Sequence, residues 1–415
     1  MEPSLAQLTR VFARIGLMSF GGPAAQIAVM HRELVEVRPW LTEDQFLRAL
    51  SFCMLLPGPE AMQLCTYAGW RLKGVTGGLI AGLLFVLPGA AVMLALVLAY
   101  AAWGTLPVVE AVFLGIKATV VIVVLQALVK LAKKALRQAD RWVIAALSFL
   151  ALYGFGAPFP SVIALAAAYG ALSATGRTED VPRPDTTATL RTALIWGGLW
   201  IAPIAAAWAA GSQILAQIGL FFSKLAVVTF GGAYAVLAYM TQEVVTRHGW
   251  LTTAQMMDGL GLAETTPGPL ILVTEFVGFL AGYGTGGIGL ALAATAMTLW
   301  VTFIPCFLWI FAAAPHVEWL TTRPRLKAAL SAITAAVVGV IANLSLWFAL
   351  HVFFAEVTQA PAPFAAALPT PGSLDLHALV LAAIAAALLL GGKRPLPLVL
   401  VLMGGAGWLV GSVTI

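Results

Sequence analysis

Two Pro-Gly-Pro tripeptides, at residues 57–59 and 267–269, lie inside apolar stretches of the sequence. The two prolines of each tripeptide remove backbone donors and clash with the preceding turn, so a helix cannot continue through it. A broken helix at bilayer depth survives only where protein or a wet cavity satisfies the freed backbone groups. The half-helix after the break has free N–H groups and a positive dipole end, which attract anions. A structural kink is the alternative, but the repetition favours an anion site.

Basic side chains in the same apolar stretches could supply the charge that an anion needs. Arg14 and Lys224 each lie six residues before a Phe-Gly-Gly tripeptide, and Lys117 lies in the middle of the stretch 107–129. A cation inside a membrane span costs about 3 kcal/mol on insertion scales, so it normally faces a cavity or a partner. Arg14 could instead snorkel from a helix end. Lys117 either pairs internally, with Glu110 two turns earlier on the same face, or lines an anion path.

Three acidic residues lie near the breaks, namely Glu60, Glu264 and Glu275. They are candidate proton carriers, because a buried carboxyl group can take up and release a proton near neutral pH. Salt-bridge partners are the alternative. The Phe-Gly-Gly tripeptides at 20–22 and 230–232 allow close backbone approach or local unwinding beside a ligand, and packing alone would also explain them.

These residues belong to a duplicated segment. Phe-Gly-Gly, Trp-Leu-Thr at 40–42, Gln45 and Pro-Gly-Pro all recur 210 residues later without a gap. Pro88 and Ile116 reappear as Pro305 and Ile333 at an offset of 217, so the second copy gains seven residues after its Pro-Gly-Pro. Each copy therefore covers about four helices.

The composition places the chain in lipid. Of its 415 residues 61% are hydrophobic and 10% are charged, and the mean hydropathy is +0.95. Soluble domains carry roughly 25% charged residues. The net charge of +5 arises from short basic loops between apolar stretches. It therefore describes membrane topology and does not indicate a nucleic-acid partner.

The basic loops predict the topology. The densest, at residues 130–141, should be cytoplasmic, because positive charge in short loops resists translocation. Counting outward from it predicts about 13 membrane-spanning helices, a cytoplasmic N-terminus and a periplasmic C-terminus. In this count 12–30, 44–70, 213–240 and 254–281 are spans, the loop 31–43 is external, and the loop 241–253 is cytoplasmic.

The predicted fold is an all-α polytopic membrane protein made of two homologous halves in inverted topology. Residues 1–173 form the N-terminal repeat of about six spans, and residues 191–415 form the C-terminal repeat of about seven. Residues 174–190 form a cytoplasmic linker. An extra span at 191–211 inverts the second copy. Inverted repeats with broken helices at the midplane are typical of secondary transporters that work by alternating access.

The repeated motifs together resemble those of the chromate ion transporter family, in its long bidomain form. The residues that carry the likeness are Phe20-Gly21-Gly22-Pro23, Trp40-Leu41-Thr42, Leu56-Pro57-Gly58-Pro59 with Gln63, and Thr266-Pro267-Gly268-Pro269-Leu270. The resemblance implies export of chromate across the bacterial inner membrane by a proton-driven antiporter, and hence chromate resistance. Sulfate, which has the same shape and charge, is the expected competitor. Glu275 departs from the family pattern, in which we expect an uncharged residue.

The repeat, the intramembrane cations and the resemblance together select candidate substrate-binding residues. They are Arg14, Ser19, Phe20, Gly21, Gly22, Pro57, Gly58, Pro59, Gln63, Lys117, Lys224, Thr229, Phe230, Gly231, Gly232, Thr266, Pro267, Gly268 and Pro269. We expect no catalytic residue, metal or cofactor, and the expected partners are a small oxyanion and the lipid bilayer. The size of the chain is also compatible with a homodimer.

Other functions remain open at this point. A carrier of sulfate or another oxyanion could use the same scaffold, and an anion channel could as well. An intramembrane enzyme would need a catalytic dyad or metal cluster, and the sequence contains no H-E-x-x-H or comparable group.

Overall fold

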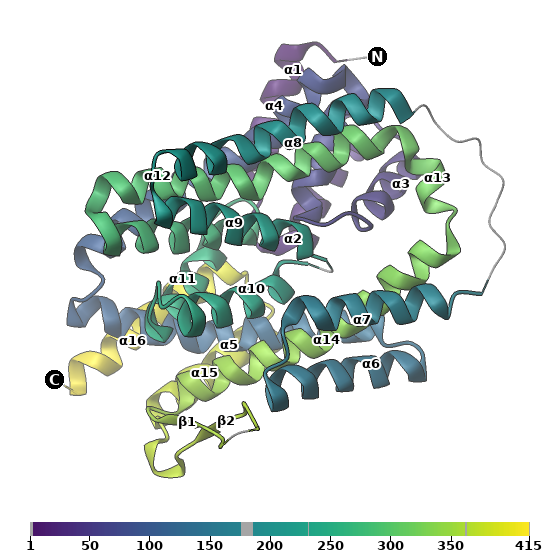
Figure 1. Cartoon of the computed structure of the whole chain (residues 1–415). Coiled ribbons are helices and arrows are strands. Elements are labelled where there is room, and N and C mark those ends of the chain that lie inside the picture. Colours follow the sequence, from purple (N-terminus) through teal and green to yellow (C-terminus); the bar gives the residue numbers. More distant parts are fainter. Residues whose placement is uncertain (1–2, 176–185, 231, 362, 415) are drawn as a thin grey trace. The chain divides into compact units, whose positions relative to one another are not determined.

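The computed structural model describes residues 3–175, 186–230, 232–361 and 363–414, which are mostly helical (Figure 1). Among them, five segments are long and apolar enough to cross a membrane: α4 (Glu60–Trp103), α5 (Pro107–Ala135), α8 (Thr186–Ala209), Leu270–His316, and α14 (Pro324–Phe353). Shorter apolar helices accompany them. This agrees with the predicted class, a polytopic helical membrane protein, while the number of crossings stays a prediction.

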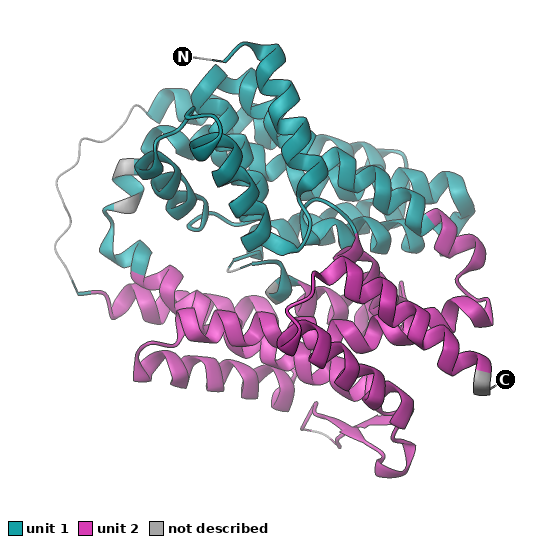
Figure 2. Cartoon of the chain, turned by 180° about the vertical axis from the view of Figure 1, so that it is seen from behind, with its two compact units in different colours: residues 1–97, 175–236, 266–327 teal, residues 98–174, 237–265, 328–415 magenta. Residues whose placement is uncertain are grey.

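The chain forms two compact units, and each takes segments from both predicted repeats (Figure 2). Unit 1 consists of Met1–Val97, Thr175–Val236 and Thr266–Lys327. Unit 2 consists of Leu98–Ala174, Leu237–Thr265 and Ala328–Ile415. Of the predicted linker 174–190, residues 176–185 lie outside the described part of the chain.

Unit 1 combines the first helices of the N-terminal repeat with separated helices of the C-terminal repeat. Its elements are α1 (Leu5–Met18), α2 (Gly22–His31), the π-helical η1 (Arg32–Glu36), α3 (Glu43–Cys53), most of α4, α8, α9 (Gln213–Val228), η4 (Leu270–Leu272), α12 (Val273–Ala313), η5 (Ala314–His316) and α13 (Val317–Thr321). Helix α12 packs along α8 and α9.

Unit 2 contains the remaining helices. Its elements are α5, α6 (Ala139–Phe149), η2 (Leu150–Gly154), α7 (Phe159–Leu172), part of α10 (Ala233–Thr241), η3 (Gln242–Arg247), α11 (Thr253–Thr265), α14, β1 (Val357–Gln359), β2 (Ala367–Pro369), η6 (Pro371–Ser373), α15 (Leu376–Ala386), η7 (Ala387–Gly391) and α16 (Leu396–Thr414). Strands β1 and β2 form a small antiparallel hairpin in which Val357 lies opposite Pro369. Helices α15 and α16 pack along α5.

The repeated Trp-Leu-Thr…Gln motif starts a helix in each copy. The Thr42 hydroxyl accepts a hydrogen bond from the Gln45 backbone, and the Gln45 side chain accepts one from the Thr42 backbone. Thr252 and Gln255 make the same reciprocal pair before α11. This capping box satisfies N–H groups that a helix start otherwise leaves free. The motif is therefore a structural start signal.

Helix α3 and the first part of α4 form a helical hairpin with the first Pro-Gly-Pro at its tip. The rings of Phe52 in α3 and Tyr67 in α4 lie 5.7 Å apart, centroid to centroid. Fifteen residues of straight helix would separate them by about 22 Å. Segment 44–70, predicted as one broken span, therefore turns back on itself, because the two prolines and Gly58 permit a reversal as well as a kink.

A second reversal follows within α4, at Lys73 and Gly74, whose backbone angles are not helical. A Cβ atom on Gly69 would lie 2.3 Å from the carbonyl oxygen of Gly77, although eight residues of straight helix would separate the two by about 12 Å. The small glycines let the two helix parts pack backbone to backbone.

The second copy reverses in the same way inside α12. Gly286 and Gly287 leave the helical conformation, with φ of −155° and 71°. A Cβ atom on Gly278 would lie 2.2 Å from the Thr298 hydroxyl oxygen, which places the two parts of α12 side by side. Both copies thus contain equivalent helix reversals.

The predicted span 12–30 is also not one helix. It breaks after Met18, and both Gly21 and Gly22 have positive φ, 84° and 78°. An ion pair of 3.6 Å joins Arg14 in α1 to Glu33 in η1. A straight helix would separate these residues by about 28 Å, beyond the reach of their side chains. The Phe-Gly-Gly motif is therefore a point of unwinding and chain bending.

Candidate functional site

The first Pro-Gly-Pro break of unit 1 is held by the second copy. The N–H of Gly58 donates to the carbonyl oxygen of Thr229 over 2.8 Å. The side-chain amide of Gln63 donates to the carbonyl of Pro57 over 2.6 Å. Gly58 has φ of 116°, and an added Cβ atom would lie 2.9 Å from the Gln63 amide nitrogen and 3.1 Å from the Cys306 sulfur. Only glycine fits this position without strain.

The second break is held by the first copy in the same manner. The N–H of Gly268 donates to the carbonyl of Ser19 over 2.8 Å. Ser19 and Thr229 are equivalent in the repeat, as are Gly58 and Gly268, so the two bonds are reciprocal. The Gln26 side chain adds a bond to the Gly268 carbonyl over 2.6 Å. Sequence reasoning missed Gln26, and its position inside an apolar stretch was the available signal.

The Ser19 and Thr229 hydroxyls are used within their own helices. Each donates to the carbonyl four residues earlier, that of Ile15 or Leu225, over 2.6 Å. Each hydroxyl thereby satisfies a carbonyl near the end of its helix, where backbone donors run out. These two residues position the breaks, and their hydroxyl protons are not directed outward.

Other hydrogen-bond donors near the breaks are the backbone N–H groups at the start of the half-helix that follows each break. The first N–H groups of a helix have no partner within it. In α4 they include the N–H groups of Ala61 and Met62, and in the second copy the half-helix restarts at Leu270. Glu60 itself lies at the first position of α4, where a carboxylate is favoured by the helix dipole.

Two side-chain features of unit 1 mark the breaks as more than packing. The Oε1 atoms of Gln26 and Gln63 are buried and have no hydrogen-bond partner among the described residues. The same holds for both carboxylate oxygens of Glu275, in the first turn of α12, which is 1% exposed. Buried polar groups are normally paired, so unpaired ones point to a functional role.

The other predicted residues of unit 1 vary in exposure. Arg14 is half exposed and pairs with Glu33, and Lys224 is exposed. Thr266, Pro267 and Pro269 are buried. Pro57, Pro59, Phe230 and Gly232 are partly buried, and Phe20 is 38% exposed. Gly231 lies outside the described residues.

Lys117 belongs to unit 2 and pairs there with a residue that sequence reasoning did not select. Its Nζ lies 3.1 Å from Oδ1 of Asp258, whose Oδ2 accepts a 2.8 Å hydrogen bond from the Tyr100 hydroxyl. The predicted partner Glu110 is therefore replaced by an acid from the second repeat. Asp258 was visible in the sequence as an acidic residue in an apolar stretch. Glu264, the third acidic candidate, is buried in the same helix, α11.

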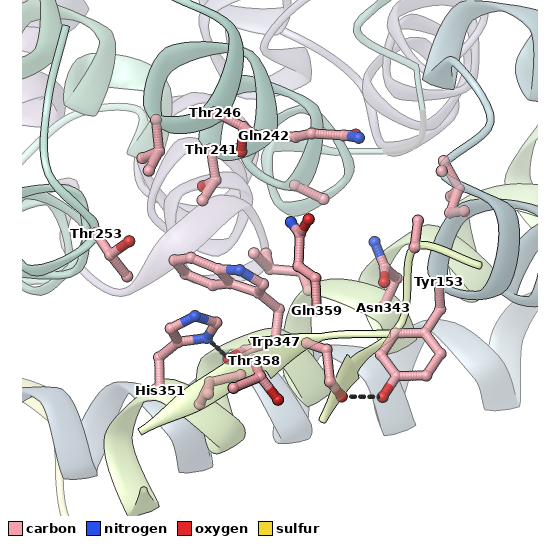
Figure 3. Close-up of a pocket in the computed structure, with 18 residues that line it drawn as sticks. Tyr153, Thr241, Gln242, Thr246, Thr253, Asn343, Trp347, His351, Thr358 and Gln359 are labelled. Carbon is pink, nitrogen blue, oxygen red and sulfur yellow. Dashed lines mark hydrogen bonds between the residues drawn. The ribbon is translucent and has the colours of Figure 1, made fainter. Parts of the chain in front are cut away.

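A polar cavity of about 260 Å³ also lies in unit 2 (Figure 3). Its lining includes Gln242, Asn343, His351 and Gln359, and among the described residues that line it none is acidic. The amide ends of Asn343 and Gln359 point into the space. His351 uses Nδ1 for a 2.8 Å contact with its own helix, which leaves Nε2 available. The side-chain amides can donate hydrogen bonds into the space, while Nε2 of a neutral His351 would accept one, because the contact of Nδ1 with a carbonyl uses the ring proton.

An adjacent cavity connects this lining to Lys117. It shares Thr253, His351 and Val357 with the first cavity and is also lined by Lys117 and Asp375. Unit 2 therefore combines neutral polar side chains with a cation that is already paired with Asp258.

The sequence model of the chromate transporter family matches residues 6–171 and 216–408. The chain belongs to the chromate transporter family. No solved structure matches the chain significantly.

Full-length relatives support this assignment. The chromate transport protein of Pseudomonas aeruginosa is 35% identical over 98% of this chain and 92% of its own length. The chromate transport protein of Cupriavidus metallidurans is 32% identical over 81% of both chains. The uncharacterized transporter YwrA of Bacillus subtilis is 29% identical over 40% of this chain and 94% of its own length. Members of the chromate transporter family are transporters rather than enzymes, and with its many apolar helices this member is a multi-pass membrane protein.

Proposed function

We propose that this chain exports chromate from the cytoplasm across the bacterial inner membrane by alternating access, as a proton-coupled antiporter that confers chromate resistance. The observation that carries the proposal is the reciprocal pair of hydrogen bonds between the breaks, Gly58 to Thr229 and Gly268 to Ser19. Each repeat supplies the support for the other's half-helix start. A pseudo-symmetric pair of this kind suits a carrier whose two halves exchange roles.

The chemistry of each unit, taken by itself, suits a tetrahedral dianion. Such an ion needs several hydrogen-bond donors and compensating charge. The half-helix starts of unit 1 supply N–H groups with a positive dipole end. In unit 2 the donor-lined cavities and Lys117 supply neutral donors and a cation. The family relatives named as chromate transport proteins favour chromate as the substrate.

The membrane potential favours export. An inside-negative potential is worth about 2.3 kcal/mol per charge per 100 mV, so a dianion gains from moving outward. Exchange for protons would add to this drive. Glu275 is the best proton carrier among the three candidates, because both its oxygens are buried without partners among the described residues. Replacing it by glutamine should keep anion binding and remove the response of transport to a pH gradient.

The test is accumulation of labelled chromate in everted vesicles, with sulfate as competitor. The proposal expects saturable, pH-gradient-dependent uptake that Lys117→Ala lowers at least tenfold and Arg14→Ala lowers less. Lys130→Ala is the matched control and should transport normally, because Lys130 lies near the end of the same helix as Lys117 and is exposed. Normal uptake by Lys117→Ala would show that Lys117 does not take part in chromate binding.

The same assay separates the alternatives. A sulfate carrier would accumulate labelled sulfate and treat chromate as the weaker competitor. A channel would pass chromate current without saturation or dependence on the pH gradient. Either outcome would overturn the proposal while leaving the family assignment unchanged.

A further inference from the structure

We propose that both Pro-Gly-Pro breaks are tips of re-entrant hairpins, which enter the membrane from opposite faces and leave by the face they entered. In this arrangement the loop 31–43 is cytoplasmic and the loop 241–253 is external, the reverse of the topology predicted from a count of apolar spans. The proposal concerns the path of the chain and does not depend on the anion transported.

The first hairpin is too short and too tightly folded to cross. Helix α3 has 11 residues, and the first part of α4, residues 60–72, has 13. These lengths correspond to about 17 and 20 Å, against about 30 Å of hydrocarbon. The packing of Phe52 on Tyr67 makes the two helices antiparallel neighbours. The start of α3 and the reversal at Lys73 and Gly74 therefore lie on the same face.

That face is cytoplasmic by its charge and its contacts. Within unit 1, α3 packs against α13 (Val317–Thr321), which directly precedes the basic cluster Arg323, Arg325 and Lys327. Basic clusters in short loops stay in the cytoplasm. Arg71 and Lys73, at the other end of the hairpin, are also basic and therefore also favour the cytoplasmic face. If 12–30 crossed the membrane, α3 would run from the external face to the midplane and would lie away from α13.

The start of α11 lies on the external face for a separate reason. Helix α14 begins at the same basic cluster and has 30 residues, enough to cross the membrane and end outside. Within unit 2, Thr253 and Ala254 at the start of α11 line one cavity with Val352 and Phe354 at the far end of α14. A cytoplasmic loop 241–253 is incompatible with this arrangement.

The second hairpin then closes consistently. Helix α11 has 13 residues and ends at the second Pro-Gly-Pro. The first part of α12, residues 273–285, is also too short to cross the hydrocarbon alone, and it ends at the reversal at Gly286 and Gly287. From there the residues up to Ala313 cross once to the cytoplasmic face, where α13 begins. The chain therefore returns to the cytoplasm at the point that the basic cluster requires.

The distribution of charge supports this path over the predicted one. Arg32 and Arg38 move from an external to a cytoplasmic loop. Among the loops then assigned to the external face, only 241–253 contains a lysine or arginine, Arg247. Four of the about 13 predicted crossings disappear, and the repeats remain inverted. One break becomes accessible along a hairpin from each side, as alternating access requires.

Cysteine labelling in the full-length chain tests the proposal. The native Cys53, Cys65 and Cys306 are buried and should react little with a membrane-impermeant maleimide. Val37→Cys and Thr246→Cys report on the two loops, and both positions are exposed.

Two further variants calibrate the labelling. Gln138→Cys is a cytoplasmic control and Gly372→Cys an external control, since both topologies agree on these two exposed positions. A side chain at residue 372 has open space, because an added Cβ atom would meet nothing within 4 Å. A single symmetric peak in size-exclusion chromatography of each purified variant in detergent shows that it is folded, and Glu36→Cys and His248→Cys, at exposed positions of the same two loops, replace any variant that is not.

We expect Val37→Cys to react only in everted vesicles, together with Gln138→Cys. We expect Thr246→Cys to react in intact cells, together with Gly372→Cys. The opposite pattern would restore full spans at 12–30 and 213–240 and overturn the re-entrant hairpins. Reaction of both loops from one side would overturn the inverted entry of the hairpins.

Discussion

At the scale of single residues, the sequence predicted which positions break helices but not which side chains meet. Gly58 and Gly268 were identified from their prolines, and both adopt positive φ at the breaks. The partner of Lys117 was predicted within its own helix, because helical spacing is the only proximity a single sequence provides. The structure brings Asp258 from a distant helix instead. Gln26 was not predicted for the same reason, since it binds the carbonyl of Gly268, 242 positions away in the chain.

The pair Lys117–Asp258 gives a stability prediction. Removing one partner of a buried ion pair leaves an uncompensated charge and costs about 3–5 kcal/mol. Lys117→Ala should therefore lower the melting temperature in detergent, and Lys117→Met combined with Asp258→Leu should recover most of the loss, because two apolar side chains need no counter-charge. Lys130→Ala, at an exposed position, should melt like the wild type. A Lys117→Ala protein as stable as the wild type would show that water already screens the pair.

At the scale of elements, helix positions followed from apolar stretches, while helix directions did not. The breaks at both Pro-Gly-Pro motifs were predicted, because the effect of proline on a helix is local. The Trp-Leu-Thr…Gln motif was recognised only as a repeat, and its role as a capping box came from the structure. Apolar periodicity is the same whether a chain continues across a break or turns back. The reversal at Gly69 and Gly77 depends on backbone packing between helix parts, which no local rule specifies.

The hairpin at the first break predicts a specific cross-link. Phe52→Cys and Tyr67→Cys, in a chain whose Cys53, Cys65 and Cys306 are replaced by alanine, should be joined by a short bifunctional thiol reagent that spans about 10 Å, because a disulfide would need closer Cβ atoms. The product is detected by mass spectrometry. The rings now occupy neighbouring space at 5.7 Å. Val108→Cys with Val123→Cys has the same sequence separation within the continuous helix α5 and should not cross-link. Equal yields from the two pairs would mean that α3 and α4 do not form a fixed hairpin.

At the scale of the whole molecule, the two sequence repeats do not coincide with the two compact units. The N-terminal repeat contributes residues to both units, and so does the C-terminal repeat. The reciprocal bonds from Gly58 to Thr229 and from Gly268 to Ser19 join the repeats inside unit 1. A half-chain therefore lacks the segments that complete each unit. The relative YwrA is nevertheless a short chain, because it matches 40% of this chain over 94% of its own length.

This interleaving predicts how a divided chain behaves. Residues 1–175 and 186–415, expressed separately, should accumulate poorly in the membrane, because each exposes apolar helix faces and unsupported breaks that the other half normally covers. Expressed together they should assemble and restore chromate export, since the division leaves every described helix intact. The measurements are the amount of membrane-bound fragment, its size in detergent and the chromate resistance of the cells. A division of the same kind inside α5, between residues 120 and 121, is the control and should abolish assembly, because it cuts a helix that packs against α15 and α16. A stable monomeric half would contradict the prediction and make each repeat an independent folding unit.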